Sequence, residues 1–147
     1  FDYDETVQLD LQEVEYNKIL PEDYGVKYVG TVYFTSKDLV REDPAFVQTF
    51  LNYLTLGWKK ALSETNESID MLYAFNSDVN REKEKESLKK GVEYFMGENG
   101  MFLYSSKDRW SAMANSLIAI GRIEEFDYEK NIDYSFLEIA LSNMKEQ

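Results

Sequence analysis

Apolar residues recur with helical spacing through most of the chain after residue 43. The clearest stretch follows Asp43-Pro44, an N-cap residue with proline at the first helical position, and predicts a helix over residues 44–62. Its expected inward stripe consists of Phe46, Val47, Phe50, Leu51, Leu54, Trp58, Ala61 and Leu62, with Tyr53 and Leu56 on a second apolar strip. Two strips predict a helix that is buried on more than one side.

Capping residues mark the other expected helices. The predicted starts are Ser36 for a short turn through Leu39 and Val40, Thr65 or Asn66, Asn80, Ser106, and about Asp133. Gly97 with Gly100 and then Gly121 are expected to end helices. The residues expected to face inward are Ile69, Leu72, Tyr73, Leu88, Val92, Phe95, Trp110, Met113, Ala114, Leu117, Ile118, Phe136, Leu137, Ala140, Leu141 and Met144. Residues 17–25 and the stretch through Phe126 and Tyr128 are expected to be loops.

Two segments are predicted to be β-strands. Val7, Leu9 and Leu11 alternate with polar residues, and residues 26–35 are rich in Val, Tyr, Phe and Thr. Large side chains on both faces of residues 26–35 predict a strand that is covered on both sides, with Gly30 at a bend. The predicted fold class is therefore helix-rich α/β, with two or three strands followed by about five helices. Because a lone pair of strands is marginal, the pattern leaves open a compact α+β domain or part of a larger α/β protein.

Composition narrows the chemistry. The chain has 147 residues, enough for one domain, and a net charge of -12, which disfavours nucleic acid and anionic membranes as partners. No run approaches the ~20 apolar residues of a membrane span. Cysteine and histidine are absent, which excludes thiolate and imidazole metal sites as well as Ser-His-Asp and Cys-His catalysis. We therefore predict no catalytic residue, no metal ligand and no cofactor.

Tyrosines give the main lead towards a binding site. Tyr24, Tyr28 and Tyr33 lie on or beside the predicted strand at residues 26–35. A tyrosine ring can stack on a planar ligand while its hydroxyl makes a hydrogen bond, although packing in a core is the common alternative. The acidic clusters, among them Glu22 with Asp23, do not match an EF-hand loop and are most simply surface charge.

From Tyr24 onward the chain resembles a known family. The motifs are Tyr24-Gly25-Val26, the β-run over residues 28–35, Pro44-Ala45-Phe46-Val47-Gln48-Thr49-Phe50-Leu51, Gly57-Trp58, Asn66-Glu67-Ser68, Arg109-Trp110 and Gly121-Arg122-Ile123. In order and spacing they resemble the C-terminal half of the periplasmic solute-binding proteins for thiamine-pyrimidine precursors, sulfonates, taurine and nitrate. Lys27 stands where the family has proline, and Asn66-Glu67 stands for Asn-Pro.

The resemblance implies the C-terminal portion of a two-lobed, type II periplasmic-binding-protein-like fold. Residues 1–147 would form a single partial domain, with residues 1–25 ending the second lobe and crossing over, and residues 26–147 supplying a strand and helices that pack on the first lobe. The implied partners are the missing N-terminal half of the same protein, a membrane ABC permease and a small-molecule ligand. The implied localisation is extracytoplasmic, either periplasmic or lipid-anchored at the cell surface.

The same resemblance implies a non-enzymatic role in transport. A small polar ligand, such as a pyrimidine precursor or a sulfonate, would bind in a cleft between the lobes. Tyr24, Tyr28 and Tyr33 become candidate cleft residues, and Glu22 or Asp23 could accept hydrogen bonds from an aminopyrimidine-like ligand. Some relatives make the thiamine pyrimidine from a histidine of their own, and this activity does not carry over to a chain without histidine.

Two alternatives to a solute-binding protein remain open. A helical protein-interaction module would expose an apolar groove between helices. A carboxylate-based hydrolase would need two carboxylates facing each other in a cleft. The binding-protein interpretation predicts instead that an apolar surface is left uncovered around residues 26–35.

Overall fold

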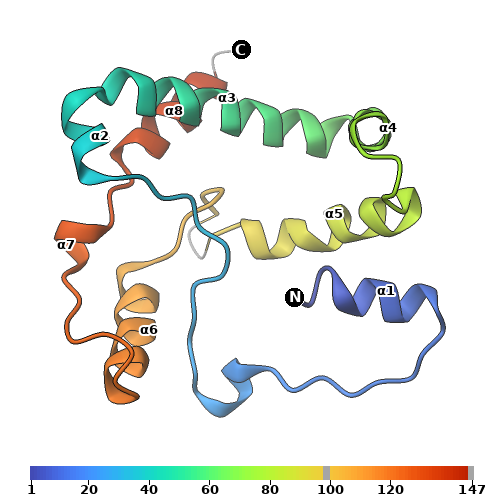
Figure 1. The fold of residues 1–147 in the computed structure, drawn as a ribbon, viewed down its shortest axis with the longest axis horizontal. Helices are drawn as coiled ribbons and strands as arrows, with labels where there is room; N and C mark the ends of the chain where they lie inside the picture. Colours follow the sequence, from blue (N-terminus) through green and yellow to red (C-terminus); the bar gives the residue numbers. More distant parts are fainter. Residues whose placement is uncertain (98–99, 146–147) are drawn as a thin grey trace.

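The computed structural model describes residues 1–97 and 100–145. The helices of this described part are α1 (Glu5–Leu11), the 3₁₀ helix η1 (Pro21–Tyr24), α2 (Lys37–Glu42), α3 (Pro44–Ser63), α4 (Thr65–Phe75), α5 (Arg81–Phe95), α6 (Lys107–Ala119), α7 (Tyr128–Asn131) and α8 (Ser135–Lys145). Figure 1 shows them as separate rods joined by turns and by one long connection between α1 and α2.

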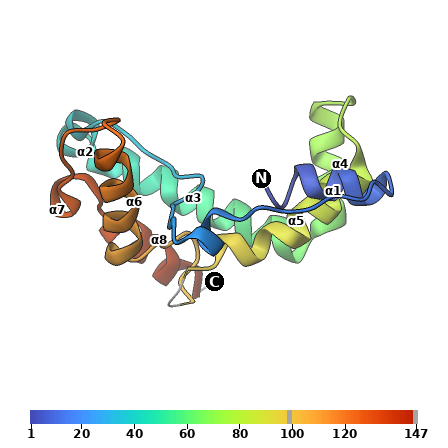
Figure 2. The ribbon, with the colours of Figure 1, turned by 90° about the horizontal axis from the view of Figure 1, so that it is seen from below.

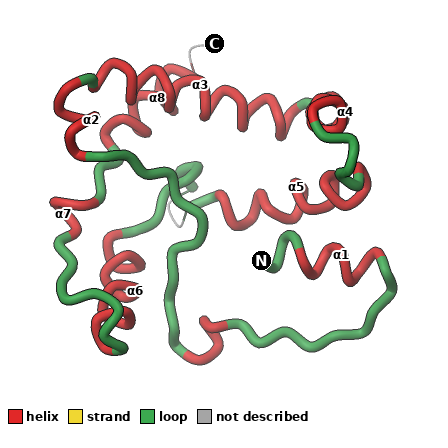
Figure 3. The backbone as a smooth tube through the Cα atoms, viewed as in Figure 1, coloured by secondary structure: helices red, strands yellow, loops and turns green. Residues whose placement is uncertain are grey.

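The α/β prediction is wrong, because the described residues contain helices but no strand (Figure 3). Residues 7–11 lie in α1, where Val7 is 5% exposed. Val7 and Leu11 are four residues apart, so their spacing suits a helix as well as a strand. Pairing in β geometry is limited, within the described ranges, to an isolated antiparallel bridge between Met96 and Phe102.

Residues 26–35 form an extended connection rather than the predicted strand. No backbone-to-backbone hydrogen bond joins residues 27–35 to another segment of the described chain. The β-favouring side chains of this segment fit a pleated surface only where a neighbouring strand is present, and here none is. Two-sided burial is also wrong, since Val32 is 42% exposed and Phe34 93% exposed.

Four capping predictions are confirmed, whereas α4 begins at Thr65 after Glu64, whose side chain makes no capping hydrogen bond. The side chains of Ser36, Asp43, Asn80 and Ser106 each accept a hydrogen bond from the backbone amide three residues later. An unpredicted one-turn helix, α7, begins after Asp127, whose carboxylate accepts from the amide of Lys130. Short polar caps act locally, which is why the sequence reveals these starts so well.

The helix α3 connects two groups of helices (Figure 2). One group holds α2, α6, α7 and α8, and the other holds α1, α4 and α5. The two ends of α8 are joined to α3 by Gln48 Nε2, which donates to the Phe136 carbonyl, and by Lys59 Nζ, which donates to the Met144 carbonyl. Thr55 is fully buried on the side of α3 that carries these contacts.

The arrangement leaves much of the chain uncovered. Its accessible surface is 10750 Å², about 3,000 Å² more than a compact monomer of this mass exposes. The buried apolar residues are Val7, Val47, Ile69, Ala114, Leu137 and Ala140. Several residues that were expected to face inward are instead exposed, namely Phe46, Phe50, Tyr53, Leu56, Leu72, Tyr73 and Ile118. Trp58 and Trp110, which were also expected to face inward, are half-buried.

Candidate ligand-binding segment

The candidate residues all lie on residues 22–33, beginning in η1. Pro21 starts this one-turn helix, and Gly25 ends it in a left-handed conformation with φ of 77°. The amide of Gly25 donates to the Glu22 carbonyl and the amide of Val26 donates to the Pro21 carbonyl, each at 3.0 Å. This turn redirects the chain into the extended connection that carries Tyr28 and Tyr33.

Arg109 fastens the first part of this segment to α6. Its Nη1 atom lies 2.5 Å from Glu22 Oε1 and 2.8 Å from the carbonyl oxygen of Tyr28. One guanidinium therefore joins a carboxylate and a backbone carbonyl that are six residues apart. Arg109 sits in the first turn of α6, and its backbone amide donates to the hydroxyl of the cap residue Ser106.

A second contact continues along α6. The amide of Val29 donates to Met113 Sδ at 3.3 Å, one helical turn beyond Arg109. Residues 22–29 are thus held against one side of α6 by two side chains. These contacts leave Tyr28 40% exposed, so the residue is accessible to a ligand or to another polypeptide.

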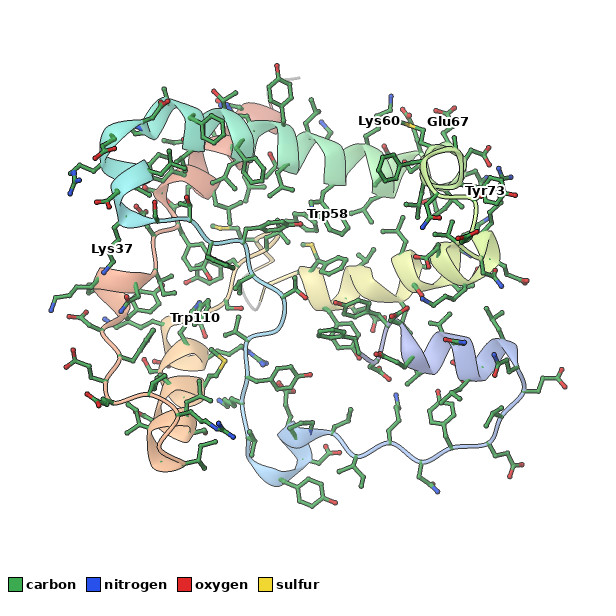
Figure 4. The ribbon with its side chains drawn as sticks, viewed as in Figure 1. Lys37, Trp58, Lys60, Glu67, Tyr73 and Trp110 are labelled. Carbon is green, nitrogen blue, oxygen red and sulfur yellow. The ribbon has the colours of Figure 1, made fainter. Side chains whose placement is uncertain are left out.

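Tyr33 is held by a different element. The indole Nε1 of Trp58, in α3, donates a hydrogen bond of 3.1 Å to the Tyr33 hydroxyl. Trp58 points from α3 into the space between α3 and α5 (Figure 4), where its ring centroid is 4.7 Å from that of Phe95 and 5.9 Å from that of Phe102. Tyr33 therefore stands at the edge of an aromatic cluster formed by Trp58, Phe95 and Phe102.

The structure brings only some of the predicted site residues together. Glu22 and Tyr28 are linked through Arg109, whereas Tyr33 is attached to the aromatic cluster. Tyr24 is 73% exposed at the end of η1, and Asp23 is exposed beside it. The predicted apolar surface around residues 26–35 is confirmed, because Val26, Tyr28, Val32, Tyr33 and Phe34 are all at least 40% exposed.

The hydrogen bonds define what the segment can offer chemically. An indole nitrogen only donates, so the Tyr33 hydroxyl must accept from Trp58, and its own proton remains able to meet an acceptor. The ring of Tyr28 supplies a flat apolar face. In the part of the chain that the structure describes, no group of three or more Asp or Glu side chains is placed to hold a metal ion. The segment thus presents a hydroxyl proton and a flat aromatic face as its accessible groups.

A polar cluster that the sequence did not reveal joins Asp2, which precedes α1, to α5. Asp2 accepts from the hydroxyl of Tyr94 and forms ion pairs with Lys18 and Lys90. The hydrogen bond from Tyr94 lowers the pKa of Asp2, and the same bond raises the pKa of Tyr94 to about 12. Residues 2 and 94 are too far apart for any local motif to predict this pair.

Arg109 was likewise missed as a residue of the candidate site. It appeared in the sequence only within the Arg109-Trp110 motif of the family resemblance. Its partner Glu22 lies 87 residues away, and a separation of that size carries no signal in a single sequence. The neighbouring Trp110 donates to the Tyr134 hydroxyl at 3.0 Å and so packs α6 against the start of α8.

Comparison with known proteins supports part of the resemblance. Residues 1–68 match the model of the family described as NMT1/THI5 like. The match covers 68 of the 147 residues, so the chain is similar to this family over less than half of its length. Searches of curated proteins and of solved structures each found no match.

The matched range covers the N-terminal helices and the candidate segment. It runs from α1 through α3 to the first residues of α4, and it contains all five candidate residues. The motifs at residues 109–110 and 121–123 lie outside it. Among the described residues, none of the helices is long and apolar enough to cross a membrane.

Proposed function

We propose that the chain is part of an extracytoplasmic solute-binding protein that delivers a small polar ligand to an ABC importer. The observation that carries the proposal is that the family match spans the same residues whose tyrosines stand exposed after η1. Most proteins of this group bind solutes rather than transform them, and a non-enzymatic role fits the donor and stacking groups described above.

The ligand class follows from the side chains available. Tyr28 and Tyr24 would stack on or enclose a planar part of the ligand, while the hydroxyl of Tyr33 would donate to an acceptor atom. Glu22 shares its carboxylate with Arg109, so Asp23 is the freer acceptor for an amino group. These groups favour an aminopyrimidine-like solute over a sulfonate, because a sulfonate would bring its negative charge close to the carboxylate of Asp23.

The partner polypeptide in this proposal is a further lobe of the same protein. It would cover the apolar residues 26–34 and close over the ligand, as in binding proteins that work by hinge closure. The surface in excess of a compact monomer, about 3,000 Å², is enough for such a contact in addition to a ligand site. A membrane permease would then receive the ligand.

Ligand binding to the full-length protein tests the proposal. Thermal unfolding is followed with an aminopyrimidine, taurine and nitrate, since a ligand that binds only the folded state raises the melting temperature. We expect the aminopyrimidine to raise it and Tyr28→Ala to weaken binding at least tenfold, or about 1.4 kcal/mol. The matched control is Tyr73→Ala on α4, because Tyr73 is 38% exposed and Tyr28 is 40% exposed.

Two results would contradict solute binding through this segment. One is the absence of any shift with all three classes of ligand. The other is equal weakening by Tyr28→Ala and Tyr73→Ala, which would indicate a general loss of stability.

The second candidate function is a helical protein-interaction module. It is favoured by a specific observation, namely that α3 leaves apolar side chains uncovered along the side opposite Thr55. Ligand binding to such a module would be absent, and association with another polypeptide would be its measurable property.

A further inference from the structure

One side of α3 carries an apolar stripe that no described element covers. Phe46, Phe50, Tyr53 and Leu56 are 55%, 50%, 72% and 40% exposed, and Gly57 continues the stripe. The opposite side of the helix holds Thr55 and the contacts with α8. Figure 4 shows the labelled Trp58 and Lys60 leaving α3 on opposite sides, with Trp58 towards the interior. The stripe therefore faces away from the rest of the described chain.

The spacing of the stripe is that of a coiled-coil seam. Asp43, Phe50 and Gly57 are seven residues apart, and Phe46, Tyr53 and Lys60 form a second set with the same spacing. Residues of the two sets alternate at intervals of three and four. This is the pattern that places successive side chains against a partner helix over the whole length of a contact.

The ends of the stripe have opposite charge. Asp43 caps the first turn of α3 by accepting from the Phe46 amide, and Lys60 lies in the last turn, where its Nζ atom is 3.3 Å from Glu64 Oε2. Antiparallel pairing of two copies would bring Asp43 of each copy opposite Lys60 of the other, and parallel pairing would bring like charges together. Of the two orientations, the antiparallel one places opposite charges against each other at both ends, with Lys60 also paired to Glu64 of its own chain.

The same antiparallel register matches the shapes along the seam. When Asp43 is opposite Lys60, Phe50 is opposite Tyr53 and Phe46 is opposite Gly57, and each contact occurs twice about the two-fold axis. A Cβ atom built on Gly57 would meet nothing within 4 Å, so there is open space above it for an aromatic ring. Parallel pairing would instead place Gly57 opposite Gly57 and leave a gap.

We propose that this face of α3, formed by Phe46, Phe50, Tyr53, Leu56 and Gly57, is a self-association surface on which a second copy of the chain docks its own α3 in antiparallel orientation. The inference is independent of solute binding, because none of these five residues belongs to the candidate ligand-binding segment of residues 22–33.

Sedimentation of the full chain over a roughly hundredfold range of concentration tests the association, at about 0.15 M salt to screen the net charge of -12. We expect a monomer–dimer equilibrium, with a dimer dissociation constant that Tyr53→Glu raises at least tenfold, or about 1.4 kcal/mol. Phe75→Glu is the matched control, since Phe75 is 92% exposed on α4, outside the stripe. A monomer at every concentration, or equal weakening by the two substitutions, overturns the proposal.

Orientation is tested by cross-linking, which the absence of native cysteine makes simple. Chains carrying Phe46→Cys and chains carrying Gly57→Cys are treated with a short bismaleimide, separately and as a mixture. The mixture is expected to give a cross-linked dimer while each variant alone does not. Cross-linking of Phe46→Cys chains with one another would indicate parallel pairing and would overturn the proposal.

Discussion

The indole N–H of Trp58 donates a hydrogen bond of 3.1 Å to the hydroxyl of Tyr33 and so ties the extended connection to α3. The pair joins a residue of the candidate ligand-binding segment to the aromatic cluster of Trp58, Phe95 and Phe102. Residues 27–35 make no backbone-to-backbone hydrogen bond with other described residues. Bonds that involve side chains therefore determine the position of this connection. Each such contact can therefore be tested by substitution.

The Trp58–Tyr33 bond is expected to show a measurable coupling. In a double-mutant cycle with Trp58→Phe and Tyr33→Phe, we expect a coupling of about 0.5–1.5 kcal/mol in the free energy of unfolding. Urea denaturation followed by circular dichroism measures it. Strictly additive effects of the two substitutions would show that the hydrogen bond contributes nothing to stability.

Arg109 is expected to control the mobility of residues 22–28. Arg109→Ala removes the bonds to the Glu22 carboxylate and the Tyr28 carbonyl, so cleavage by trypsin after the exposed Lys27 should become several-fold faster. Glu22→Gln should have a smaller effect because the bond to the Tyr28 carbonyl remains. Arg122→Ala, at an exposed residue beyond the end of α6, is the control, and equal acceleration by Arg122→Ala would refute the role of Arg109.

The packing around Ala140, on α8, should not accommodate a larger side chain. Ala140 is 1% exposed, so Ala140→Leu should lower the free energy of unfolding by about 1–3 kcal/mol through overpacking. The neighbouring Ile139 is 50% exposed, and Ile139→Leu should change stability by less than about 0.5 kcal/mol. Chemical denaturation compares the two variants, and similar small effects would contradict close packing at Ala140.

The Asp2–Tyr94 pair predicts how stability depends on pH. The pKa of Tyr94 is raised to about 12 by its hydrogen bond to Asp2, so this contribution is complete below pH 10 and is lost as the pH rises towards 12. The pKa of Asp2 is lowered, first by the bond from Tyr94, so its contribution is present above about pH 4 and is lost as the pH falls through the lowered pKa.

Spectroscopic titration of tyrosinate tests this pair. Asp2→Asn should bring the pKa of Tyr94 down towards the ordinary value near 10. Glu125→Gln, at an exposed carboxylate elsewhere in the chain, should leave the titration unchanged. If the titration curves of the two variants coincide, the hydrogen bond to Asp2 does not raise the pKa of Tyr94.

Local chemistry explains how much of the fold the sequence could reveal. Asp43 and Asn80 cap helices by binding amides only three residues away, and such signals are complete within a short window. Residues 26–35 have strand-like composition, but a strand exists only with a neighbour to bond to. Similarly, Phe46 and Phe50 have the spacing of a buried face, and the described chain supplies nothing to bury them.

The candidate site was predictable to a lesser degree. The tyrosines and acidic residues of the segment could be named from the sequence, and Tyr28 and Tyr33 are in fact accessible. Their supports, Arg109 and Trp58, come from α6 and α3, and their contacts with Glu22 and Tyr33 depend on tertiary packing. What the segment binds is set by such packing and by any polypeptide that covers it.

The central claim, that residues 22–33 bind a small solute, is tested most directly by calorimetric titration of the full-length protein with an aminopyrimidine. We predict saturable binding that Tyr28→Ala weakens at least tenfold and that Tyr73→Ala leaves within about twofold, since 1.4 kcal/mol corresponds to a factor of ten. Binding with the same affinity in the parent and in Tyr28→Ala, or the absence of any heat of binding, would contradict the account.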